Sequence, residues 1–220
     1  HDNLYLRNIA WGLNQISYGS EDGLYINGHV TGNSPYLTFE WKAGKDGEHH
    51  EVKTQLIGEY NFANALAAVT IGHFFDVESG KIDTALKEYT PQNNRSQLKQ
   101  TADNTLIIDA YNANPTSMQA SISNFHNMEI DNKMLILGDM RELGKDGPKE
   151  HQKIVDFLTE CGFKDVMLVG EQFAAARHDF PTYPDAPAVI EALQKNKPHG
   201  KTILIKGSNG IKLSTVIDYL

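Results

Sequence analysis

The sequence contains a single cysteine, Cys161, and no apolar run that approaches the roughly 18 residues of a transmembrane helix. One cysteine excludes an internal disulfide and is typical of a protein from a reducing cytoplasm. No signal peptide opens the chain, and we expect no membrane-spanning segment. The net charge of −8 argues against a general affinity for nucleic acid or anionic lipid.

Several catalytic and binding motifs are also missing. The chain has no G-x-x-x-x-G-K-[ST] phosphate loop and no complete G-x-G-x-x-G loop. No spacing of cysteine and histidine fits zinc, and no G-x-S-x-G nucleophile elbow is present. The first residue is His1 rather than methionine, which suggests a fragment of a longer protein.

The composition of the 220 residues, with 40% hydrophobic and 22% charged residues, is that of an ordinary globular protein of one or two domains. Residues up to about 57 are strand-like and rich in turns, which predicts a small antiparallel meander. The expected strands are 16–19, 24–30, 36–41 and 51–56. Two helices, near 62–69 and 79–89, precede an expected linker at 91–94.

From about residue 100 strands and helices alternate. The four apolar strands expected there are 105–109, 134–137, 166–169 and 203–205. This alternation indicates right-handed βαβ units and a mostly parallel sheet that is covered on both faces. The predicted fold class is therefore α/β, with antiparallel strands plus helices in residues 1–92 and a Rossmann-like domain in residues 95–220.

The end of the strand at 105–109 is the most informative point. Asp109 closes the apolar run, and Asn114 and Pro115 follow with the preferences of a helix N-cap and first helical residue. Open α/β sheets bind ligands at such strand ends. Asp139 and Lys206 follow other strands, so parallel strands would gather them at the same edge. The alternative is that these residues only form turns.

Two further features suit a nucleotide. Asn61 and Asn64 are three residues apart at the start of a helix, and their amides could read the edge of a purine. Arg95, in the linker, is a planar and permanently charged partner for phosphate. The alternatives are an N-cap with a surface asparagine, and a solvated linker arginine.

Together these segments resemble the Mur ligases over essentially the whole chain. The segments that carry the resemblance are the asparagine helix at 58–68, Asn94-Arg95-Ser96, residues 109–118, Leu137-Gly138-Asp139-Met140 with Glu142-Leu143-Gly144 and His151, and Lys206-Gly207-Ser208. The Tyr-Asn-Ala-Asn-Pro turn and the Leu-Gly-Asp-Met segment resemble those of the members that use D-alanyl-D-alanine.

The resemblance implies an ATP-dependent amide ligase of the cytoplasm, acting in peptidoglycan synthesis. It would activate UDP-N-acetylmuramoyl-tripeptide as an acyl phosphate and add D-alanyl-D-alanine. Residues 1–92 would be the C-terminal part of the central ATP-binding domain, and residues 95–220 the C-terminal domain. The phosphate loop and the Mg²⁺ ligands would lie upstream, so this fragment alone is expected to be inactive, and the protein to be a monomer.

The resemblance also implies roles for individual residues. Asn61 and Asn64 would approach adenine, Asp109 the ribose hydroxyls, and Arg95 the terminal phosphates as a catalytic residue. The expected substrate-binding residues are Asn112, Asn114, Asp139, Lys206 and Ser208. No metal ligand is expected in this chain. The sequence departs from the family pattern at Tyr60, at Ile108 and Ala110, and at Asn209, where many relatives have arginine.

Two other functions fit the same residues. One is a sibling Mur ligase or a folylpolyglutamate-type ligase with another amino acceptor. The other is a non-catalytic nucleotide-binding module of the flavodoxin-like kind.

Overall fold

The computed structural model describes residues 2–92 and 94–220. The chain forms two compact units, His1–Thr90 and Pro91–Leu220, and we describe each by itself. No helix among the described residues is long and apolar enough to cross a membrane.

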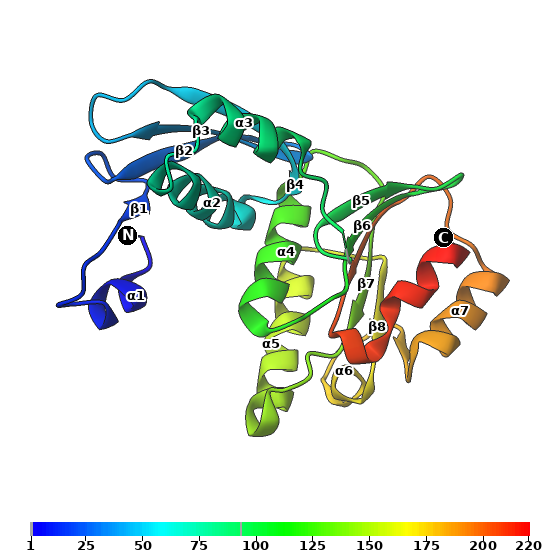
Figure 1. Ribbon diagram of the computed structural model, residues 1–220. Coiled ribbons are helices and arrows are strands. Elements are labelled where there is room, and N and C mark those ends of the chain that lie inside the picture. The colour runs from blue at the N-terminus through cyan, green and yellow to red at the C-terminus, as the bar shows by residue number, and fades with distance from the viewer. Residues whose placement is uncertain (1, 93) are drawn as a thin grey trace. The chain divides into compact units, whose positions relative to one another are not determined.

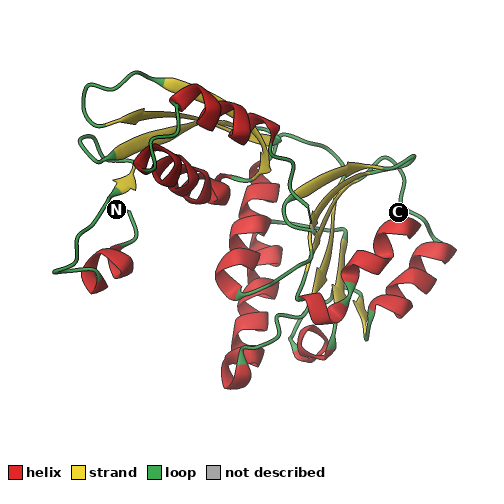
Figure 2. Cartoon of the chain, viewed as in Figure 1, coloured by secondary structure: helices red, strands yellow, loops and turns green. Residues whose placement is uncertain are grey.

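Unit 1 contains a four-stranded sheet with the strand order β1-β2-β3-β4 (Figures 1 and 2). Its strands are β1 (Tyr18–Gly19), β2 (Ile26–Asn33), β3 (Tyr36–Ala43) and β4 (His50–Ile57). Its helices are α1 (Leu4–Ile9), the 3-10 turn η1 (Glu59–Asn61), α2 (Phe62–Phe74) and α3 (Ser79–Glu88). The alternate residues Leu37, Phe39 and Trp41 of β3 are buried in one core with α2 and α3.

The expected antiparallel meander is correct for only part of this sheet. β2 pairs with β3, and β3 with β4, in antiparallel fashion, but β1 runs parallel to β2 with Tyr18 opposite Ile26. Alternation of apolar and polar residues predicts a strand and not its direction. The direction is set by the loop at 20–25, which returns the chain to the same end of the sheet before β2 begins.

Unit 2 is built on a six-stranded sheet with the order β5-β6-β10-β7-β8-β9. Its strands are β5 (Gln97–Gln100), β6 (Thr105–Asp109), β7 (Lys133–Gly138), β8 (Val166–Val169), β9 (Thr182–Tyr183) and β10 (Thr202–Lys206). Its helices are α4 (Pro115–Asn127), α5 (Gly147–Glu160), α6 (Glu171–Ala175) and α7 (Ala186–Lys195), with the 3-10 segments η2 (Gly144–Asp146), η3 (Asn209–Ile211) and η4 (Leu213–Tyr219). The predicted α/β fold with a mostly parallel sheet is confirmed, and only the edge strand β5 is antiparallel.

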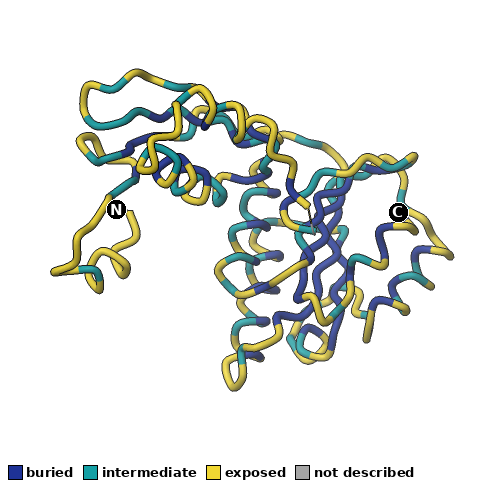
Figure 3. The backbone as a smooth tube through the Cα atoms, viewed as in Figure 1, coloured by how far each residue is buried: buried dark blue, intermediate teal, exposed yellow. Residues whose placement is uncertain are grey.

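Helices cover both faces of this sheet, which is why its central strands are apolar along their length (Figure 3). Leu106 and Ile108 of β6 belong to the core that includes α7 and η4. The other face is covered by α4 and α5 (Figure 1). Because side chains alternate along a strand, Ile107 and Asp109 point toward α4.

The start of α4 agrees with the sequence prediction. The Asn114 Oδ1 atom accepts a hydrogen bond from the Ser117 backbone N–H at 2.8 Å, and the Ser117 hydroxyl accepts one from the Asn114 N–H at 3.2 Å. Pro115 occupies the first turn, where its missing N–H costs nothing. These hydrogen bonds fix the backbone where the turn between β6 and α4 ends and the helix begins.

Candidate functional site

A buried ion pair lies at the carboxyl end of β6. Lys206, the last residue of β10, is in parallel register with Asp109. The Lys206 Nζ atom donates to Asp109 Oδ2 at 2.5 Å, and the lysine is only 1% exposed. A buried ammonium group is costly unless it is paired, so Asp109 makes the burial of Lys206 tolerable.

The two oxygens of Asp109 differ in their surroundings. Oδ2 also accepts a hydrogen bond from the Ser121 hydroxyl of α4 at 3.2 Å, so a strand and a helix both hold it. Oδ1 has no hydrogen-bond donor in the part of the chain that the structure describes. The Asp109 side chain is 14% exposed. One oxygen is thus fixed by the protein, and the other can accept a hydrogen bond from a ligand.

The turn that follows Asp109 carries two of the predicted substrate-binding residues. The Asn112 carbonyl oxygen lies 3.5 Å from Lys206 Nζ, at the long limit of a hydrogen bond, and Asn112 itself is exposed. Asn114 uses its side-chain oxygen to cap α4. The structure thus brings Asn112, Lys206 and Asp109 together. The side chain of Asn114 instead caps α4.

Arg95 lies against this same turn. Its guanidinium carbon is 3.9 Å from the centroid of the Tyr111 ring, and both residues are exposed. The Asn94 carbonyl oxygen accepts a hydrogen bond from the Ala110 N–H at 2.9 Å, which joins the segment before β5 to the residue after β6. Sequence reasoning found Arg95 and did not find its aromatic neighbour.

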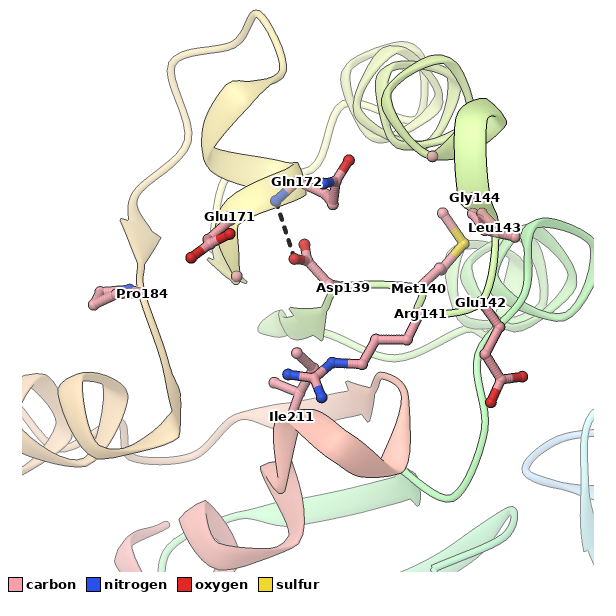
Figure 4. A pocket seen from close by; sticks show the side chains of 12 residues that line it. Asp139, Met140, Arg141, Glu142, Leu143, Gly144, Glu171, Gln172, Pro184 and Ile211 are labelled. Carbon is pink, nitrogen blue, oxygen red and sulfur yellow. Dashed lines mark hydrogen bonds between the residues drawn. The ribbon is translucent and has the colours of Figure 1, made fainter.

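Asp139 follows β7 at the same edge of the sheet, with only 6% of its surface exposed. Its two oxygens accept the backbone N–H groups of Gln172 and Phe173, each at 3.0 Å. Figure 4 shows the hydrogen bond from Gln172. These amides belong to the first turn of α6, where an acid is favourable. Asp139 therefore acts as a helix cap supplied from another strand, and its role toward a substrate stays a prediction.

His151 of α5 lies beside Asp139 and is completely buried. Its Nε2 atom accepts the Met140 N–H at 3.0 Å, so this nitrogen carries no proton. Its Nδ1 atom, 2.7 Å from the Gly147 carbonyl oxygen, must then be the one that donates. The imidazole is thus neutral, and its 3.5 Å contact with Asp139 is not an ion pair.

Ser208 is nearly buried and holds the loop that follows β7. Its hydroxyl accepts the Arg141 N–H at 2.8 Å, and its own N–H donates to the Asp139 carbonyl oxygen at 3.2 Å. Like Asp139, it fixes the backbone at this edge of the sheet, and its direct contact with a substrate stays a prediction.

A cavity of about 380 Å³ opens beside these residues (Figure 4). It is lined by residues 139–144, Gly147, residues 170–172, Pro184 and Ile211. The side chain of Arg141 extends toward Ile211. It also lies against Gly210, because a Cβ atom added to this glycine would be 2.5 Å from the Arg141 Nη1 atom. Arg141 was missed by the sequence analysis because nothing in its local pattern shows that η3 lies across the cavity from it.

The predicted adenine-binding pair belongs to unit 1. Asn61 Nδ2 donates to the Ile57 carbonyl oxygen at 2.8 Å, and Asn64 Nδ2 lies 3.5 Å from Asn61 Oδ1. The two side chains therefore adjoin at the start of α2, as their spacing predicts. Asn64 is exposed and lines a cavity of about 450 Å³ together with Tyr18 and Phe62.

The described residues contain no group of three or more histidine, cysteine, aspartate or glutamate side chains that could hold a metal ion.

Fold and site together define an α/β domain with a candidate ligand site at the carboxyl edge of its parallel sheet. A family profile described as the Mur ligase, glutamate ligase domain matches residues 94–209, just over half of the chain. The chain belongs to the Mur ligase family.

Two curated relatives that match this chain carry the same name, UDP-N-acetylmuramoyl-tripeptide–D-alanyl-D-alanine ligase. The protein from Bacillus subtilis is 28% identical over 223 aligned positions, which cover 93% of this chain and 48% of the relative. The protein from Synechocystis is 27% identical and covers all of this chain and 48% of the relative. The chain thus spans about half the length of the curated relatives it matches.

Solved structures agree with the fold. MurF from Acinetobacter baumannii has a TM-score of 0.80 at 24% identity, covering 98% of this chain and 48% of that one. The MurF ligase from Thermotoga maritima in complex with ADP has a TM-score of 0.80 at 18% identity, covering 99% and 51%. At these identities the likeness concerns the fold alone.

Proposed function

We propose that the intact protein is an ATP-dependent ligase that joins D-alanyl-D-alanine to UDP-N-acetylmuramoyl-tripeptide in peptidoglycan synthesis. The observation that carries this proposal is the end of β6, where Lys206 occupies one oxygen of Asp109 and leaves the other available. The turn that follows supports Arg95, a cation without an acidic partner among the described residues. The name that these two curated relatives share supports the choice of substrates.

In this proposal unit 1 is the C-terminal part of the central ATP-binding domain, and unit 2 is the C-terminal domain. The amides of Asn61 and Asn64 offer donors and acceptors to the edge of adenine. Asp109 Oδ1 accepts a hydrogen bond from a ribose hydroxyl. We further propose that the protein is a monomer and works in the cytoplasm, where ATP and the nucleotide-linked substrate are made.

The chemistry gives each charged group a task. A carboxylate becomes reactive toward an amine when it receives the γ-phosphoryl group of ATP, which forms an acyl phosphate and releases ADP. The amine of the dipeptide then attacks the carbonyl carbon, and phosphate leaves as the amide bond forms. Phosphoryl transfer depends on positioning and on neutralising charge, which suits the guanidinium of Arg95.

The cavity beside β7 is the proposed place of the dipeptide. The loop that Asp139 and Ser208 hold in shape forms one wall, and Arg141 contributes a cation that has no hydrogen-bond partner for its side chain in the described part of the chain. An acyl phosphate must be kept from water, so a site with a rigid wall favours attack by the amine over hydrolysis.

The test is a ligation assay with the intact protein, UDP-N-acetylmuramoyl-tripeptide and ATP. We expect product by mass spectrometry with D-alanyl-D-alanine and none with glutamate or a diamino acid. Product with another amino acid would indicate a sibling ligase. Adenosine binding without any product would indicate a non-catalytic module.

A matched pair of variants tests the role of Arg95. Arg95→Ala should lower turnover at least tenfold, because an arginine that stabilises transferring phosphate is commonly worth more than that, about 10³-fold or greater in related phosphoryl transfers. Arg177→Ala removes an exposed arginine elsewhere in unit 2 and should leave turnover unchanged. Equal turnover in the two variants would contradict the assignment of Arg95.

A further inference from the structure

The contact between Arg95 and Tyr111 has features that a chance surface contact would lack. The guanidinium carbon lies over the ring, 3.9 Å from its centroid, although 45% of Tyr111 is exposed. Within the residues that the structure describes, Arg95 makes no hydrogen bond or ion pair, and the Tyr111 hydroxyl has no hydrogen-bond partner. Among the described residues, the Tyr111 ring is therefore the side-chain group that we find oriented against this arginine.

Stacking suits an arginine that must bind phosphate. A carboxylate partner would occupy the N–H donors in the plane of the guanidinium and cancel its charge. An aromatic ring instead contacts the face of the guanidinium and leaves its five in-plane donors and its charge available. Tyr111 thus restricts the motion of Arg95 without competing for its ligand.

The backbone brings the two side chains together. β5 and β6 are antiparallel with Gln97 opposite Ile108, so continuation of this pairing takes the chain before β5 past the residues after β6. The Ala110 N–H donates to the Asn94 carbonyl oxygen at 2.9 Å, next to both side chains. Asn94 and Ser96, which flank Arg95, have positive φ angles of 57° and 46°. Such conformations persist where the surroundings enforce them.

We propose that Tyr111 is a positioning residue that holds the Arg95 guanidinium over the β6–α4 turn, ready for the terminal phosphates of the nucleotide. This inference rests on the proposed function, because it takes Arg95 as the phosphate partner. Tyr111 is two residues after Asp109. One turn therefore carries the acid proposed to bind ribose and the ring that positions Arg95, the proposed phosphate partner.

The first experiment tests the contact itself, without any activity. A tyrosine ring shifts protons above its face upfield, so the Arg95 δ-methylene protons of the 220-residue chain should show a ring-current shift by NMR. The shift should persist in Tyr111→Phe and disappear in Tyr111→Leu. The shifted signal is assigned to Arg95 if it is lost in the Arg95→Lys variant. An Arg95 signal at the position of an unstructured arginine in the unaltered chain would overturn the proposal.

The second experiment measures kinetics of the intact protein. Tyr111→Leu should raise the KM for ATP or lower kcat/KM for ATP about two- to fivefold, the range of an exposed cation–π contact. Tyr111→Phe should stay within about twofold of the unaltered enzyme, because the ring and not the hydroxyl carries the contact. Tyr219→Leu, at another exposed tyrosine of unit 2, is the matched control and should change nothing.

A double-variant cycle completes the test. If Tyr111 acts through Arg95, Tyr111→Leu should have no further effect on kcat/KM in an Arg95→Ala background. Additive effects, or a Tyr111→Leu enzyme with the kinetics of the unaltered one, would overturn the inference and leave the proposed ligase activity intact. An unaltered enzyme without ligation would instead overturn the proposed function, while the NMR result would still decide whether the contact exists.

Discussion

Asp109 and Asp139 occupy equivalent places at the carboxyl edge of one parallel sheet, each directly at the end of an apolar strand. Their surroundings differ. Asp139 is 6% exposed, and both of its oxygens receive backbone amides from the first turn of α6. Asp109 is more exposed, and a buried lysine and a serine share one of its oxygens. The same residue type at the same kind of strand end serves as an internal cap in one place, and in the other keeps one oxygen without a donor among the described residues.

The difference follows from what packs opposite each acid. A short helix begins beside Asp139 and presents two N–H groups that have no partner within the helix. β10 ends beside Asp109 and presents a single ammonium group, which needs only one of the two oxygens. Each acid meets two donors, which share one oxygen of Asp109 and occupy both oxygens of Asp139. The placement of the donors therefore decides how much of a carboxylate remains for a ligand.

The largest effect on stability is expected at the ion pair. Asp109→Ala leaves the ammonium of Lys206 buried without its carboxylate partner, which should cost about 3–5 kcal/mol in the free energy of unfolding. The measurement is urea denaturation followed by far-UV circular dichroism. Both tryptophans, Trp11 and Trp41, belong to unit 1, so tryptophan fluorescence provides an internal reference.

A second variant shows whether the charge or the packing matters. Lys206→Met in the Asp109→Ala background removes the buried charge and should restore most of the lost stability. If the double variant is as unstable as Asp109→Ala alone, the unpaired lysine is not the cause of the lost stability. The proposed difference between Asp109 and Asp139 would then be wrong.

An intermediate effect is expected where α6 approaches Asp139. Gly170 has a φ of 120°, and a Cβ atom there would lie 2.3 Å from the Asp139 carboxyl carbon. Gly170→Ala should therefore cost about 3 kcal/mol, from backbone strain together with loss of the buried cap. Gly162→Ala is the matched control, because Gly162 also has a positive φ of 73° but a Cβ atom there would meet nothing within 4 Å beyond its chain neighbours. Equal melting temperatures of the two variants would show that the contact with Asp139 is unimportant.

The smallest effect is expected at Asp103, a carboxylate at the opposite end of β6 that faces solvent. Hydrogen bonds from Lys197 and then His199 hold the pKa of Asp103 below its usual value. A lowered pKa in the folded state contributes stability above the unfolded pKa, near 4, and this stability is lost as the pH falls through the folded value. Asp103→Asn should thus lower the melting temperature slightly at pH 7 and not at pH 2.5, by differential scanning calorimetry. The same decrease at both pH values would argue against the ion pair.

Local signals in the sequence predicted much of this molecule. The four apolar strands, the helix cap at Asn114 and the position of Asp109 all depend on residues within a few positions of each other, and all three are confirmed. The short edge strands β5 and β9 were missed, because four polar-rich residues and a two-residue strand carry no clear periodicity.

The features that the sequence could not predict depend on contacts between distant segments. Lys206 pairs with a residue 97 positions earlier, and this pairing requires that β10 lies between β6 and β7. The caps that Asp139 and Ser208 provide depend in the same way on which loops meet at the sheet edge. The apolar runs that end in Asp109 and Asp139 identified the two acids. The strand order is needed to show which hydrogen-bond donors lie opposite each of them.

The central position of β10 also constrains how unit 2 is made. β6 and β7 emerge from the ribosome long before residues 202–206, and until then each has an unpaired apolar edge on the side where β10 belongs. Such edges invite association with other chains. Unit 2 must therefore be shielded, or must fold late, until β10 has been synthesised and can be inserted.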